Sequence, residues 1–178
     1  MDASVAGVVG AAIGALGAVA GGWLSVLGQG RQRQLQSDRE HRREAARREA
    51  YGGLIASTKL LSAAWWRFSD VLWTEQSTPE QWRTSFAEAH KAWTQFSTAV
   101  AAVVVSGPVS AAEAAEVLRV AMYDWEKAGM DWFAAALREG RGQVDECPER
   151  FNRSAEAKRA PDRAFQHAAQ VALGTEHP

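Results

Sequence analysis

The chain has 178 residues and a formal net charge of −1, with 20 Lys and Arg against 21 Asp and Glu. Residues 51–178 hold 13 basic and 16 acidic side chains, which excludes the strongly basic surface of a typical nucleic-acid-binding domain. The single cysteine, Cys147, excludes an intramolecular disulfide and agrees with a reducing compartment.

The first predicted element is the run between Asp2 and Arg31, which carries no charged side chain. About 20 apolar residues in a helix cross a bilayer core, so we expect residues 1–28 to form a transmembrane helix. Glycines recur here at spacings of three, four and seven residues, which return to one helix face and let two membrane helices pack closely as a glycine zipper. The residues predicted to mediate self-association are Gly7, Gly10, Gly14, Gly17, Gly21 and Gly28.

This run has two alternative interpretations. A cleaved signal peptide begins with basic residues, whereas no Lys or Arg precedes this run. A buried soluble helix is the other alternative, although each glycine costs about 1 kcal/mol relative to alanine in a helix in water. A retained span is the favoured interpretation.

Residues 29–50 are predicted to form an Arg-rich helical stalk beside the membrane. Seven arginines and four acidic residues lie in residues 31–50, and positive charge marks the cytoplasmic flank of a span. We therefore expect an inner (cytoplasmic) membrane protein with its N-terminus outside, a cytoplasmic C-terminal domain, and contact between the stalk and membrane lipid. The alternative is a solvated helix with ion pairs such as Glu44 with Arg48, and the interspersed acids disfavour DNA binding. The residues assigned to topology and lipid contact are Arg31, Arg33, Arg39, Arg42, Arg43, Arg47 and Arg48.

Residues 51–174, followed by a tail at 175–178, show the three-and-four spacing of amphipathic helices and no strand-like alternation. The first helix is predicted from about residue 29 to Thr74. Thr78 is a predicted cap with Pro79 at the first helical position of the second helix, which ends at Ser106.

A capping-box pattern from Ser110 to Glu113 is predicted to open the third helix, which ends at Gly140. A polar loop then leads to a shorter amphipathic segment that ends at Gly174. The predicted fold is all-α: an N-terminal transmembrane helix continuing into a long stalk helix and an antiparallel three- to four-helix bundle. Its predicted inward positions are Tyr51, Leu54, Ile55, Leu61, Trp65, Phe68, Leu72, Trp82, Phe86, Ala89, Trp93, Phe96, Val100, Val103, Leu118, Met122, Trp125, Trp132, Phe133, Leu137, Phe151, Phe165, Ala169 and Leu173.

Trp65 and Trp66 are adjacent, so the two indoles cannot both face one core. One interpretation places one of them at a contact with a partner or another subunit, where aromatic residues are frequent anchors. The other leaves both partly buried beside the last helix. We carry both forward.

Residues suited to chemistry are few. The four histidines have no spacing that places two metal ligands on one helix face, and no nucleotide loop or nucleophile arrangement is present. We therefore expect no enzyme activity, no metal and no cofactor. Cys147 lies among acidic residues that raise a thiol pKa, which favours a bystander role.

Two charged segments have alternative interpretations. The segment from Arg138 to Gly142 is either a helix stop or a weak anion site. Asp124, Glu126 and Asp131 are predicted to form a solvated face of the third helix rather than an acid/base pair.

The order of features carries a resemblance. A Gly/Ala-rich N-terminal span precedes the run Arg42–Tyr51, and the segment Val103–Pro108 precedes an Ala-rich helix. This layout resembles a group of small streptomycete single-span membrane proteins, some of them similar to the plasmid-spread protein KilB. The resemblance implies an actinobacterial, membrane-associated, non-enzymatic protein that helps plasmids move between hyphal compartments, and it supplies no catalytic residues.

These features predict a self-associating single-span membrane protein whose cytoplasmic bundle acts as a scaffold or recruiting module. Its expected partners are lipid, further copies of itself and an unidentified protein. The alternative is a holin-like or pore-forming protein assembled through the glycine-striped helix. It is disfavoured because one helix without a polar stripe lines a water-filled pore poorly.

Overall fold

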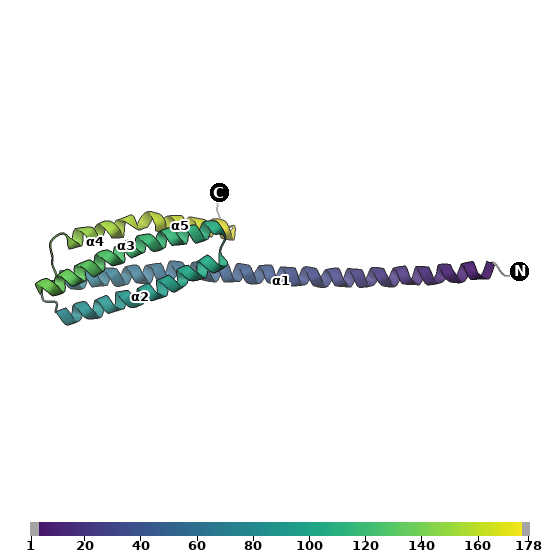
Figure 1. The fold of residues 1–178 in the computed structure, drawn as a ribbon, viewed down its shortest axis with the longest axis horizontal. Coiled ribbons are helices and arrows are strands. Elements are labelled where there is room, and N and C mark those ends of the chain that lie inside the picture. The colour runs from purple at the N-terminus through teal and green to yellow at the C-terminus, as the bar shows by residue number, and fades with distance from the viewer. Residues whose placement is uncertain (1–3, 176–178) are drawn as a thin grey trace. The chain divides into compact units, whose positions relative to one another are not determined.

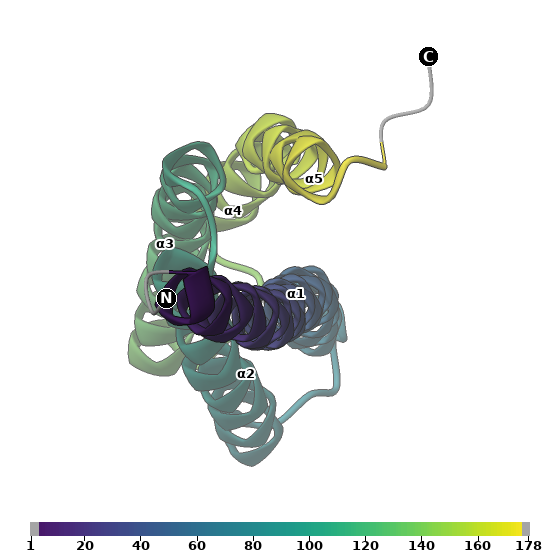
Figure 2. The ribbon, with the colours of Figure 1, turned by 90° about the vertical axis from the view of Figure 1, so that its right-hand side faces the viewer.

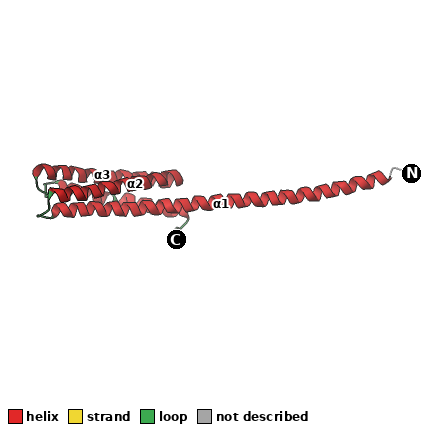
Figure 3. Ribbon diagram, turned by 90° about the horizontal axis from the view of Figure 1, so that it is seen from below, coloured by secondary structure: helices red, strands yellow, loops and turns green. Residues whose placement is uncertain are grey.

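The computed structural model describes the backbone of residues 4–175 and the side chains of residues 36 and 38–175. The described residues form the helices α1 (Ser4–Trp73), α2 (Pro79–Ser106), α3 (Val109–Glu139), α4 (Cys147–Ala157) and α5 (Arg159–Leu173), which are labelled in Figure 1. The described backbone contains helices and loops but no strand (Figure 3), so the predicted all-α class is confirmed. The chain divides into two compact units, residues 1–43 and residues 44–178.

Among the helices whose side chains are described, none is long and apolar enough to cross a membrane. The predicted span, residues 1–28, and its six glycines lie outside the residues with described side chains, as do Arg31 and Arg33. The span, its glycine stripe and these two arginines therefore stay predictions.

The unit from residue 44 onward is an antiparallel helical bundle, seen end-on in Figure 2. α3 packs against α2, α4 and α5. Aromatic rings of α1 reach the other helices: Trp65 contacts Phe86 of α2, and Trp66 contacts Trp125 of α3. Tyr51 contacts Phe165 of α5. The predicted antiparallel bundle is confirmed, with α4 and α5 together forming its fourth member.

The fourth member is divided because proline cannot continue a helix. Pro161 lacks an N–H, and its ring clashes with the carbonyl of the residue four positions earlier. That residue is Ala157, the last residue of α4, so α5 starts after Lys158 and places Pro161 in its first turn.

Local signals determine most helix ends. Thr78 caps the start of α2 and Pro79 lies in the first turn, as predicted, and Gln81 completes a capping box with Thr78. Gly140 and Gly174 end α3 and α5 with φ of 67° and 64°, a conformation that favours glycine. The predicted capping box at Ser110 is wrong. α3 begins two residues earlier, because Pro108 occupies the N-cap position with extended backbone and its carbonyl accepts the first helical hydrogen bonds.

The core contains most of the predicted inward positions, including Trp65, Trp82, Trp125 and Trp132. Some predicted positions are only partly buried: Ile55, Phe86, Trp93, Phe133 and Leu173. The prediction that Leu137 faces inward is wrong. The last turns of α3 bury Ala135 and Ala136 and leave Leu137 36% exposed.

Two glycines permit close approaches that spacing did not predict. A Cβ on Gly129 of α3 would lie 2.2 Å from Cζ3 of Trp65, so the indole occupies the space of the missing side chain. A Cβ on Gly142 would lie 2.2 Å from the backbone oxygen of Leu72. Both positions therefore need glycine for packing.

Candidate functional site

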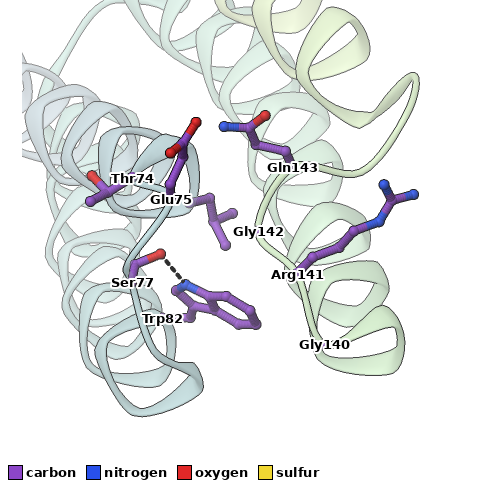
Figure 4. A pocket seen from close by; sticks show the side chains of 9 residues that line it. Thr74, Glu75, Ser77, Trp82, Gly140, Arg141, Gly142 and Gln143 are labelled. Atoms are coloured by element: carbon purple, nitrogen blue, oxygen red, sulfur yellow. Dashed lines mark hydrogen bonds between the residues drawn. The ribbon is translucent and has the colours of Figure 1, made fainter.

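A concavity lined by polar residues lies at one end of the bundle, between the α1–α2 turn and the loop after α3. We call this concavity the end pocket (Figure 4). Its volume is about 300 Å³. Its lining residues are Leu72, Thr74, Glu75, Ser77, Trp82, Gly140, Arg141, Gly142 and Gln143.

Hydrogen bonds at this end tie the loops to the helices. The Trp82 Nε1–H donates to Ser77 Oγ at 2.7 Å, as drawn in Figure 4. The buried Trp132 Nε1–H donates to the Gly142 carbonyl at 2.8 Å, and Gln143 Nε2 donates to the Trp73 carbonyl at 3.0 Å. The indole and amide donors are thus engaged in closing the end of the bundle.

The end pocket also tests the anion interpretation of the segment from Arg138 to Gly142. Arg141 pairs with Glu139 at 2.9 Å. The Glu75 carboxylate lines the same pocket and opposes a bound anion. Gly140, with φ of 67°, ends α3. This arrangement favours the helix stop over the anion site.

Glu126 corrects the prediction of a solvated acidic face on α3. Its side chain is buried, and Oε1 lies 3.3 Å from Nδ1 of the exposed His90 on α2. Burial raises the pKa of Glu126, and the hydrogen bond and charge of His90 act in the opposite direction. A signal was present in the sequence: Glu126 follows Met122 by four residues, which places it on the apolar face.

The other two acids of that face behave differently. Asp131 is exposed and forms an ion pair with Arg150 of α4. Asp124 is exposed, as predicted. Only Glu126 is thus buried, because it alone lies on the inward side of the helix.

Cys147 opens α4 and is partly buried. Burial is the largest cause that raises the pKa of its thiol, and the carboxylates of Glu139 and Asp131 raise it further. Arg150 and Arg138 act in the opposite direction. The direction agrees with the sequence prediction, whereas the main cause is desolvation rather than acidic neighbours along the chain. The raised pKa lowers the thiolate fraction and disfavours nucleophilic chemistry.

The described arginines of the stalk differ in their exposure and in their contacts. Arg39, Arg42 and Arg43 are exposed. Arg48 pairs with Glu44, the ion pair proposed from helical spacing. Arg47 donates from Nε to the Ser106 carbonyl at 3.1 Å and thereby caps the end of α2. Arg47 therefore stabilises the bundle through a contact that the sequence did not indicate.

The adjacent tryptophans of α1 have opposite environments. Trp65 is fully buried, whereas Trp66 is 42% exposed while its ring packs against Trp125 and Phe151. Of the two predicted contact residues, Trp66 alone presents surface to a partner. Trp73, one heptad further along α1, is 48% exposed and packs against Trp132.

Within the described side chains, no group of three or more His, Cys, Asp or Glu residues could hold a metal ion. No protein-family model matches the chain, and no curated protein or solved structure is significantly similar to it. The resemblance to KilB-like streptomycete proteins is untested by these comparisons.

Proposed function

We propose that this chain is a non-enzymatic protein that crosses the cytoplasmic membrane once, self-associates, and uses its cytoplasmic bundle as a scaffold or recruiting module. Residues 1–28 would form the span, with the N-terminus outside. The excess of arginine in residues 31–50 supports this orientation, because positive residues stay on the cytoplasmic side.

One observation carries the recruiting role. On α1, Trp66 and Trp73, which are one heptad apart, are 42% and 48% exposed, although the same helix fills the core with aromatic side chains. Large rigid side chains held half-exposed on a packed scaffold are the usual anchors of protein interfaces. The hydrogen bonds of the end pocket, by contrast, are engaged in closing the bundle, which supports a binding module over an enzyme.

Self-association is assigned to the glycine stripe and is tested in the membrane. Gly14→Leu combined with Gly17→Leu places bulk on the stripe, where close backbone approach would be lost. Ala12→Leu combined with Ala15→Leu adds the same bulk on the opposite helix face by helical spacing. We expect crosslinking and native mass analysis of the intact protein to show loss of the oligomer only in the glycine variant.

A chain shortened to residues 29–178 completes this experiment. An oligomer that persists in the shortened chain would move assembly to the bundle and contradict the role given to the glycines. Dye leakage from vesicles holding the intact protein would instead favour the pore-forming alternative.

A further inference from the structure

We infer that the groove between α1 and α2 binds a basic amphipathic helix of a partner protein. This inference rests on the proposed recruiting role and adds a binding surface apart from Trp66 and Trp73, with a stated class of partner. The α1–α2 groove is distinct from the end pocket and has a volume of about 450 Å³. The residues that define it are Arg67, Asp70 and Val71 of α1 and Glu80, Thr84 and Glu88 of α2.

Charge favours a basic partner. Three carboxylates line the α1–α2 groove, those of Asp70, Glu80 and Glu88, against the single guanidinium of Arg67. Glu80 lies 3.6 Å from Arg83, an exposed pair, whereas no ion pair engages Asp70 or Glu88 within the described part of the chain. Two solvated carboxylates on opposite walls are therefore available to cations of a ligand.

Apolar contact supplies the rest of the recognition, because exposed ion pairs are weak by themselves. Partly buried Val71 and buried Ser85 lie in the same groove, and the charged side chains add aliphatic stems to its walls. A ligand that suits this lining carries aliphatic side chains on one face and Lys or Arg beside them.

The backbone of the walls favours a helical ligand. Both walls are α-helix, so their N–H and C=O groups are paired within α1 and α2 and offer no edge to an extended peptide. A helical ligand suits such walls, because it pairs its own backbone groups, as in helix-in-groove recognition. Residues 80–88 of α2 span about 12 Å of helix axis, which corresponds to roughly two helical turns of ligand.

The test uses the full chain in a neutral detergent and a fluorescent helical peptide of about 14 residues made of Ala and Lys with two leucines four residues apart. A second peptide carries Glu at every Lys position. Binding is followed by fluorescence anisotropy and corrected with protein-free micelles. We expect saturable binding of the Lys peptide and none of the Glu peptide.

Two variants place the binding in the groove. Asp70→Lys combined with Glu88→Lys reverses the free charges, and Thr84→Trp fills the groove without changing charge. Glu113→Lys combined with Asp124→Lys is the matched control, since it makes the same charge change at exposed positions of α3. We expect affinity to fall about tenfold or more in both groove variants and to change less than about twofold in the control.

Two results would overturn the inference. Equal weakening by the groove and control charge reversals would mean that the peptide senses only net charge. Loss of the crosslinked oligomer in Thr84→Trp would mean that a second copy of this chain, and not a partner, occupies the groove. Peptide binding that persists when Gly14→Leu and Gly17→Leu abolish the oligomer would separate this inference from the proposed self-association. Far-ultraviolet circular dichroism checks that every variant is folded.

Discussion

α1 packs closely against α3 but less closely against α2, and we call these two helix–helix interfaces seams. Against α3, the Trp65 indole lies where a Cβ on Gly129 would be 2.2 Å away, so that seam has no room for even a methyl group. Against α2, the outer part of the seam opens into the α1–α2 groove of about 450 Å³. One face of α1 thus stabilises the bundle by close packing, whereas another face leaves an open groove to which we assign recognition.

Gly129→Ala should produce the largest change in the free energy of unfolding, because it adds a methyl group where α1 and α3 are closely packed. The new methyl group would collide with a buried ring that cannot swing into solvent, so we expect a loss of about 3–4 kcal/mol in the free energy of unfolding. Denaturant titration followed by tryptophan fluorescence measures it. Gly53→Ala is the control: its Cβ would meet nothing within 4 Å, so it should stabilise α1 by up to about 1 kcal/mol. Equal effects of both changes would refute the close-packing explanation.

Gly142→Ala should rank second. Its Cβ would lie 2.2 Å from the Leu72 backbone oxygen, although the loop has more freedom to shift than a helix. We expect a loss of about 2–3 kcal/mol, measured in the same titration. Gly140→Ala, which introduces only the strain of a positive φ, should cost about 1 kcal/mol. A smaller cost at Gly142 than at Gly140 would contradict the contact with Leu72.

Glu126→Gln probes a third seam, between α2 and α3. Burial raises the pKa of Glu126 despite His90, so the folded state binds this proton more tightly than the unfolded state does. That contribution to stability is complete below the unfolded-state pKa and is lost as the pH rises through the folded-state pKa. At about pH 8 we expect the free energy of unfolding of the glutamine variant to exceed that of the wild type by roughly 1 kcal/mol. This difference should disappear near pH 3, where the Glu126 carboxyl is protonated in both the folded and the unfolded state.

Thermal unfolding at the two pH values measures this difference. Glu113→Gln, at an exposed position of the same helix, should leave the melting temperature unchanged at both. A glutamine variant that is less stable than the wild type at about pH 8 would mean that the bond to His90 outweighs the cost of burying the charge.

Thr84→Trp should have the smallest effect on stability, and it tests directly whether the α1–α2 seam is more open than the α1–α3 seam. Its side chain enters the open α1–α2 groove, so the free energy of unfolding should change by no more than about 0.5 kcal/mol. The same titration that detects the added methyl at Gly129 should then barely detect an added indole at Thr84. A large destabilisation by Thr84→Trp would mean that this seam is closed.

Helical spacing predicted the inward faces well where a whole face is apolar, as for Leu54, Leu61 and Phe68. For Glu126, spacing from Met122 also indicated the apolar face, but the residue was predicted to be solvated. Glu126 was assigned to solvent because nothing along the chain partners it, whereas its partner His90 comes from α2. The capping box at Ser110 failed for a local reason, since Pro108 begins the helix earlier.

Helical spacing predicted only part of the candidate contact surface. Two adjacent tryptophans imply that one must leave the core, and helical spacing placed Trp65 on the inward face, which the structure confirms. The close fit of Trp65 to Gly129 was not predicted. The groove was not foreseen at all, because its acidic walls come from helices whose register is set by packing.

By itself, the sequence determined the all-α class, the boundaries that Thr78, Gly140 and Gly174 mark, and most of the apolar faces, because these depend on neighbours within one or two turns of the chain. Only the tertiary structure decided that Trp65 packs on Gly129, that Glu126 lies beside His90, that Arg47 caps α2, and where a groove remains. Those outcomes depend on steric fit and electrostatic contact between helices distant in the chain, which spacing along one helix does not encode.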